Sequence, residues 1–172
     1  MRASVIPELR TTPPEDMDEI TLESLEHLVL AQAQECFWQK AVKDGLKDGS
    51  IAKLAVQVSD YYALAADFGS KSDAISDEWV SHTTAKHYHF AAASQYRAAC
   101  DCLEKRKYGE EVARLRDSLS CVNEALKEVA SVNGTVAGDS RGLKNRVQED
   151  LKRAEKDNDL IYLRMSWKRQ SP

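Results

Sequence analysis

The stretch from Leu28 to Leu54, LVLAQAQECFWQKAVKDGLKDGSIAKL, predicts two helices joined by a tight corner. The first helix is apolar on more than one side of a helical wheel, with Phe37 on one side and Trp38 on another. A helix of this kind is expected to be sandwiched between neighbours. Residues 47–50, Lys-Asp-Gly-Ser, are the expected corner, and their serine is the expected N-cap of the second helix. Two helices joined in this way form an antiparallel hairpin.

The remaining chain repeats helical spacings and shows no sustained period of two, so the expected fold class is all-α. The clearest pattern is a stripe with spacings of 3 and 4 from Val112 to Val129, which is typical of a long antiparallel hairpin. Gly134 and Gly138 place a loop at about 131–141. The helices are expected at about 22–46, 51–68, 77–107, 108–129 and 143–156.

Three regions of unequal character are expected along the chain. Residues 1–17 form an irregular lead, because three of the four prolines fall within it. Residues 18–163 form one helical domain. Residues 164–172, RMSWKRQSP, are basic and unpatterned, and a disordered tail is expected there. Gly69 is expected to end the second helix in a left-handed conformation, and Ser76 or Asp77 to cap the third.

Composition excludes several classes of function. The formal net charge of −4 provides no basic face for general nucleic-acid binding. No run of about 18 apolar residues is present, so no membrane span is expected. The four cysteines lie inside helical patterns, where we expect reduced core residues of a cytosolic protein.

Catalytic, metal and cofactor sites are not expected. His82, His87 and His89 share one predicted helix, but the last two point about 200° apart, and the outer two are about 10 Å apart along its axis. We interpret them as exposed or capping side chains. No nucleophile–base spacing, CxxC motif or Gly-rich phosphate loop occurs.

Phe37 and Leu54 flank the predicted corner, and two interpretations of them stay open. Both are core residues, or both line an apolar groove that receives another protein's amphipathic helix. In the second interpretation Lys53 and Lys47 contribute positive charge to the rim.

Three blocks resemble the BRO domain family, the boomerang-shaped helical domain of Alix and its fungal relatives. They are LAQAQECFWQKAVKDGLKDGSIAKLAVQVSDYY, TAKHYHFAAASQYRAACDCLEKRKYGEEVARLRDSLSCVNEALKE and LKNRVQEDLKRAEKDNDLIY. Two further stretches, IPELRTTPPEDMDEITLESLE and ISDEWVSHTTAKHYHFAAA, are most similar to the PalA-type branch of ambient-pH adaptors. The resemblance implies a TPR-like solenoid portion of a BRO domain, its C-terminal half.

This resemblance implies a non-enzymatic, cytoplasmic scaffold that binds the C-terminal helix of an ESCRT-III subunit at endosomes. The family's docking patch maps onto Phe37 and Leu54. Its third position is usually Ile but is Ser50 here, so the affinity for the partner helix is expected to be lower than is usual in the family. Tyr162 matches a phosphorylation and docking position of an animal relative. A pH-signalling protease and a transcription factor are expected to bind through regions outside this chain, and partners are expected to bring it to the endosomal membrane.

Two rival functions remain. A generic TPR-like module would hold a peptide on the concave surface at Ala91–Arg97. A self-associating structural protein would instead pair the exposed faces of two copies into a homodimer.

Overall fold

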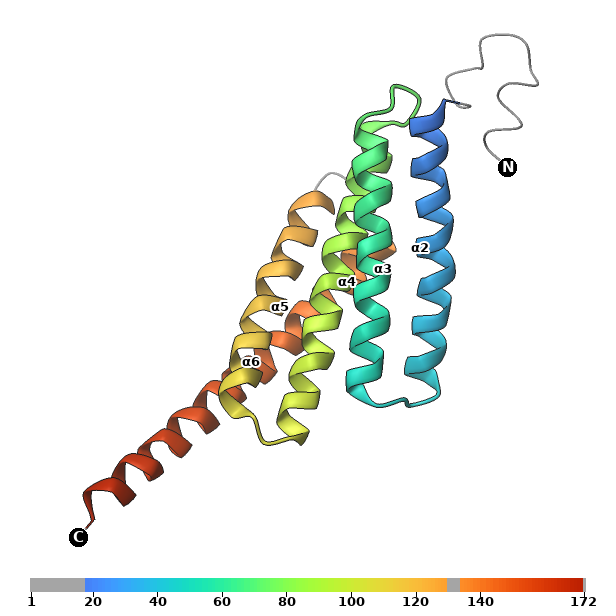
Figure 1. Cartoon of the computed structure of the whole chain (residues 1–172). Coiled ribbons are helices and arrows are strands. Elements are labelled where there is room, and N and C mark those ends of the chain that lie inside the picture. Colours follow the sequence, from blue (N-terminus) through green and yellow to red (C-terminus); the bar gives the residue numbers. More distant parts are fainter. Residues whose placement is uncertain (1–17, 130–133, 172) are drawn as a thin grey trace, which may run out of the picture.

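The computed structural model describes residues 18–129 and 134–171 (Figure 1). This part of the chain contains five helices and no strand, which confirms the expected all-α class of antiparallel hairpins. The expected lead over residues 1–17 lies outside the described residues. In chain order the helices are α2 (Glu19–Lys43), α3 (Asp48–Ser70), α4 (Asp77–Glu104), α5 (Tyr108–Glu128) and α6 (Thr135–Gln170).

Each helix packs mainly on the helix that precedes or follows it in the chain. α4 lies in the middle, between α3 and α5, while α2 lies at one edge (Figure 1). α6 packs on α5 and, to a smaller extent, on α4, and its C-terminal half extends beyond the other helices (Figure 1).

Two main cores hold the stack together. In the first, between α2, α3 and α4, the buried rings of Tyr62 and Phe90 stack 6.1 Å apart, and Trp38 meets Phe90 edge-on at 5.1 Å. The second core joins α4, α5 and α6, and it contains Leu143 of α6 and the predicted stripe of α5. Its buried members are Ala92, Ala93, Ala99, Val112, Leu115, Val122, Leu143, Val147 and Ala154.

The corner between α2 and α3 differs from the expected one. α2 ends at Lys43, and the turn is centred on Gly45, whose φ of +68° is left-handed. The amide of Leu46 donates to the carbonyl of Ala41 (3.1 Å) and that of Gly45 to Val42 (3.2 Å), which is a Schellman motif. The expected corner at 47–50 is wrong, because these residues include the first turn of α3.

Gly69 is also not the left-handed cap that was expected. It lies inside α3, where a Cβ would come within 3.1 Å of Ser24 Oγ on α2. A larger residue would crowd this close approach of two helices, which Ser24 strengthens by donating to the carbonyl of Ala65 at 2.7 Å. The predicted N-cap of α4 is confirmed at Ser76, which accepts a hydrogen bond from the Trp79 amide.

α6 is longer at both ends than the helix expected at 143–156. Most of the expected 131–141 loop is its first turns, because Val136, Ala137 and Ser140 pack inward and become buried. Gly138 and Gly142 are exposed on the same turns, and the inward packing outweighs their cost of about 1 kcal/mol each.

Residues 164–170 continue α6 in place of the disordered tail expected over 164–172. The physical reason is local, since neither glycine nor proline occurs between Leu143 and Ser171, so nothing interrupts the hydrogen-bond ladder. Residue 172 lies outside the described residues.

Candidate functional site

The outer face of the α2–α3 hairpin carries the residues expected to bind a partner. The hydrogen bond from Gln34 Nε2 to Gln57 Oε1 (2.6 Å) fixes how the two antiparallel helices face each other. Phe37 of α2 and Leu54 of α3 each lie three residues nearer the corner than this pair, so they occupy the same level of the hairpin. Phe37 is 64% exposed and Leu54 is half-buried.

The polar residues of this face surround the two apolar ones. Ser50 and Lys53 lie on the first turns of α3 and are exposed, and Lys47 is the exposed residue that immediately precedes this helix. The structure thus brings the five expected residues to one end of the hairpin. We call Phe37, Ser50, Leu54, Lys53 and Lys47 the hairpin patch; binding at this patch stays a prediction.

The two apolar sides of α2 had led us to expect a helix sandwiched between neighbours, and this expectation is wrong. One side faces inward, where Ala31 is buried and Trp38 packs on Phe90. The other side, which holds Leu30 and Phe37, is exposed at 40% and 64% because α2 is an edge helix. Cys36, beside Phe37, is exposed as well, so the expectation that all four cysteines are core residues is wrong; among the four, Cys102 alone is buried.

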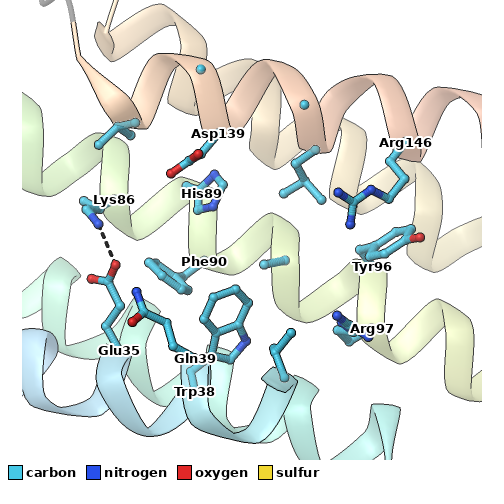
Figure 2. A pocket seen from close by; sticks show the side chains of 16 residues that line it. Glu35, Trp38, Gln39, Lys86, His89, Phe90, Tyr96, Arg97, Asp139 and Arg146 are labelled. Carbon is cyan, nitrogen blue, oxygen red and sulfur yellow. Dashed lines mark hydrogen bonds and ion pairs between the residues drawn. The ribbon is translucent and has the colours of Figure 1, made fainter. Parts of the chain in front are cut away.

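A cavity of about 420 Å³ lies between α2, α4 and α6 (Figure 2). Figure 2 shows side chains from all three helices pointing into it, with Trp38 from α2, His89 from α4 and Arg146 from α6. Tyr96 and Arg97 line it too, which places part of the Ala91–Arg97 surface of the rival peptide-binding hypothesis here.

An ion pair closes one end of this cavity. Lys86 Nζ lies 2.8 Å from Glu35 Oε1, and both side chains are less than 20% exposed. The other Glu35 oxygen accepts a hydrogen bond from the Tyr62 hydroxyl at 2.6 Å. Burial, and then this bond to Glu35, raise the pKa of Tyr62, so its proton stays in place. The Lys86 ammonium also lies 5.6 Å from the ring centroids of Tyr62 and Phe90.

The histidines were expected to be exposed or capping residues, and this expectation is wrong. Burial, followed by the positive charge of Lys86, lowers the pKa of His89 to about 4, and its Nδ1 lies 3.0 Å from Ser140 Oγ. His87 Nδ1 lies 2.8 Å from Ser59 Oγ. Both rings therefore connect helices through hydrogen bonds, and no local pattern in the sequence indicates partners that lie 28 and 51 residues away.

Three of the charged side chains that line the cavity have ion-pair partners. Glu35 is paired with Lys86, and Arg97 Nη1 lies 3.0 Å from Asp48 Oδ1 of α3. Trp38 Nε1 is a buried donor with no partner within the described residues. In the same part of the chain, no group of three His, Cys, Asp or Glu side chains is placed to hold a metal ion.

Tyr162 lies far from the hairpin patch, on the protruding part of α6. Its side chain is 69% exposed, so its hydroxyl is accessible to a modifying enzyme. Phosphorylation at Tyr162 stays a prediction.

A profile of the BRO1-like domain matches residues 2–169 of the chain. Among curated proteins, the pH-response regulator protein palA/RIM20 of Aspergillus oryzae is 71% identical over 163 residues, which are 95% of this chain and 20% of that protein. Its counterpart in Emericella nidulans is also 71% identical, over 95% of this chain and 19% of the relative. The chain thus spans about one fifth of the length of these relatives.

Among solved structures, a complex of the ALIX BRO1 domain with CHMP4C superposes with a TM-score of 0.85. The sequence identity is 30%, and the match covers 94% of this chain and 44% of the ALIX chain.

Proposed function

The chain belongs to the BRO1-like domain family, and we propose that it acts as a non-enzymatic adaptor module that binds the C-terminal amphipathic helix of an ESCRT-III subunit. The 71% identity to pH-response regulators supports a role in fungal ambient-pH signalling. A role in endosomal sorting is part of the same proposal. The likeness to an ALIX BRO1 domain solved with CHMP4C supports the class of partner.

The observation that carries this proposal is the exposure of Phe37 at the level of Leu54. An exposed Phe ring beside a half-buried Leu, on two helices held in fixed register, offers an apolar surface to the apolar face of a visiting helix. Lys53 and Lys47 at the edge complement acidic residues of that helix. Ser50 replaces an apolar contact of the patch with a hydroxyl, so the affinity is expected to be lower than that of a relative with Ile there.

The remaining partners are proposed for the longer relatives. The pH-signalling protease and the transcription factor would bind through regions outside this chain. The module would act in the cytoplasm and reach endosomes through its ESCRT-III partner.

The test is isothermal titration of the 172-residue chain with an ESCRT-III C-terminal peptide. Phe37→Ala is expected to weaken binding by about 2–4 kcal/mol if Phe37 is an interface anchor, and Leu54→Asp to weaken it as strongly. Trp79→Ala is the matched control, because Trp79 is an exposed aromatic residue on another helix, at 51%. Undiminished binding by both patch variants would remove this site from consideration.

The same titration distinguishes the rival docking site in the cavity. Arg97→Ala removes a cavity-lining charge that does not belong to the hairpin patch. Loss of peptide binding in Arg97→Ala, together with full binding in Leu54→Asp, would place the peptide between α2, α4 and α6. Sedimentation of the free chain tests the rival homodimer. If the exposed faces of two copies pair at the hairpin patch, Phe37→Ala is expected to weaken the dimer.

A further inference from the structure

The C-terminal part of α6, residues 160–170, exposes a dense group of large apolar side chains, and we call it the α6 tip. Figure 1 shows that it extends beyond the other helices. Large apolar side chains along it are exposed by more than half, namely Leu160 51%, Tyr162 69%, Leu163 56%, Met165 55% and Trp167 75%.

The α6 tip combines an apolar stripe with positive charge. Leu160, Leu163 and Trp167 have spacings of 3 and 4, so they lie along one side of the helix. On a helical wheel Arg164 and Lys168 lie about 40° and about 80° from Leu160, and therefore on one flank of the stripe. With Arg169, the α6 tip carries three basic residues and no acidic one, in a chain whose net charge is −4.

We propose that the α6 tip binds an anionic phospholipid surface as an interfacial helix. The stripe of Leu160, Leu163 and Trp167 would enter the boundary between headgroups and acyl chains, while Arg164 and Lys168 would extend to the phosphates. Trp167, the aromatic residue of the stripe, belongs to a residue type that favours this depth of a bilayer. Each basic residue near an anionic surface adds roughly a fivefold increase in affinity.

The geometry favours lying on the surface over crossing it. No helix of the described residues is long and apolar enough to span a membrane. The α6 tip is about 16 Å long at 1.5 Å per residue, which is about half the thickness of a hydrocarbon core. A second copy of the chain is a poorer occupant, because pairing two α6 tips would bring the three basic residues of each together.

The base of α6 holds the α6 tip in a fixed direction. Val147 and Ala154 are buried in the second core, and Arg153 pairs with the buried Glu111 of α5. Arg153 also pairs with Asp157 (3.3 Å), just before the α6 tip. The helix is therefore already formed before it meets a surface, so little conformational entropy remains to be lost on binding.

The experiment uses the whole chain with vesicles of phosphatidylcholine, prepared with and without phosphatidylserine. In a Trp79→Phe background, which leaves Trp38 in the core, the emission of Trp167 reports its surroundings. We expect flotation with the phosphatidylserine vesicles, a blue shift of Trp167, and weakening by salt.

Two variants separate the charge from the stripe. Replacing Arg164, Lys168 and Arg169 together with Gln is expected to lower the partition coefficient about 100-fold. Leu163→Ser is expected to lower it at least tenfold. The matched control is Val29→Ser on α2, since Val29 is 63% exposed but far from the α6 tip, and it is expected to bind as the parent does.

Equal binding to both kinds of vesicle, no binding to either, or full binding by Leu163→Ser would overturn the proposal. So would self-association of the chain that is lost in Leu163→Ser without any vesicle binding, because the α6 tip would then belong to a dimer interface. Leu163→Ser is expected to keep full affinity for the ESCRT-III peptide, so failure at the α6 tip and failure at the hairpin patch are distinguishable.

Discussion

A buried carboxylate at the start of α5 depends on one arginine of α6. Glu111 is 2% exposed and accepts a hydrogen bond and ion pair from Arg153 Nη2 through Oε1. Its second oxygen has no partner within the described residues. The position in the first turn of α5 is favourable for a negative charge, but the contribution of the helix dipole is only about 0.3–1 kcal/mol. Arg153 is therefore the principal group that balances this charge.

Arg153→Met keeps the aliphatic stem and removes the charge, so it leaves the Glu111 carboxylate buried and unpaired. Breaking a fully buried pair costs about 3–5 kcal/mol. The Arg153 side chain is 38% exposed, so water can reach part of the site and reduce the cost. We expect a loss of about 2–3 kcal/mol in the free energy of unfolding.

The assay is urea unfolding followed by the helical circular dichroism signal. Arg116→Met is the matched control, because Arg116 also joins α5 to α6 by pairing with Glu155 at 3.0 Å, but there the side chains are 65% and 43% exposed. That variant is expected to lose less than about 1 kcal/mol. The double variant Glu111→Leu with Arg153→Met is expected to recover most of the loss. An Arg153→Met variant as stable as Arg116→Met would refute the dependence of Glu111 on Arg153.

Two further predictions concern the left-handed helix ends and the buried histidine. Gly45 (φ +68°) and Arg106 (φ +59°) occupy the equivalent left-handed position after α2 and α4. In thermal or urea unfolding, Gly45→Ala is expected to destabilise the chain by about 1 kcal/mol and Arg106→Gly to stabilise it by about 1 kcal/mol. A change of the same sign in both variants would contradict the assignment of these positions. His89 has a pKa of about 4 in the fold, so the unfolded chain, with a pKa near 6.5, takes up the proton first as the pH falls. Stability is thus expected to fall by about 2 kcal/mol between pH 7 and pH 5, a loss that His89→Asn largely removes; an unchanged pH slope would show that His89 is not its source.

Features that depend on local pattern could be predicted from the sequence. The stripe from Val112 to Val129 predicted the inward side of α5, where Leu115 and Val122 are at most 1% exposed. Burial there follows directly from helical periodicity. The cap at Ser76 was predictable for the same reason, since its partner is only three residues away.

Features that depend on distant packing could not be predicted. Phe37 and Trp38 are neighbouring aromatic residues, and Trp38 is the one that points inward because it packs on Phe90, which lies on another helix. The sequence therefore left open whether Phe37 is a core or a surface residue. The start of α6 is similar, because its glycines indicate a loop, whereas the contact of Ser140 with His89 forms only in the folded chain. At the corner between α2 and α3, Gly45 could have indicated the left-handed helix end from the sequence, but the corner was predicted at residues 47–50.

The sequential packing of the helices has a consequence for how the molecule opens. Because α4 is covered by α3 on one side and α5 on the other, its amide protons are expected to exchange with solvent last, while α2 and the far end of α6 exchange first. Opening of this kind spreads inward from two independent margins. A ligand that steadies one margin would slow exchange there and leave the opposite margin as labile as before.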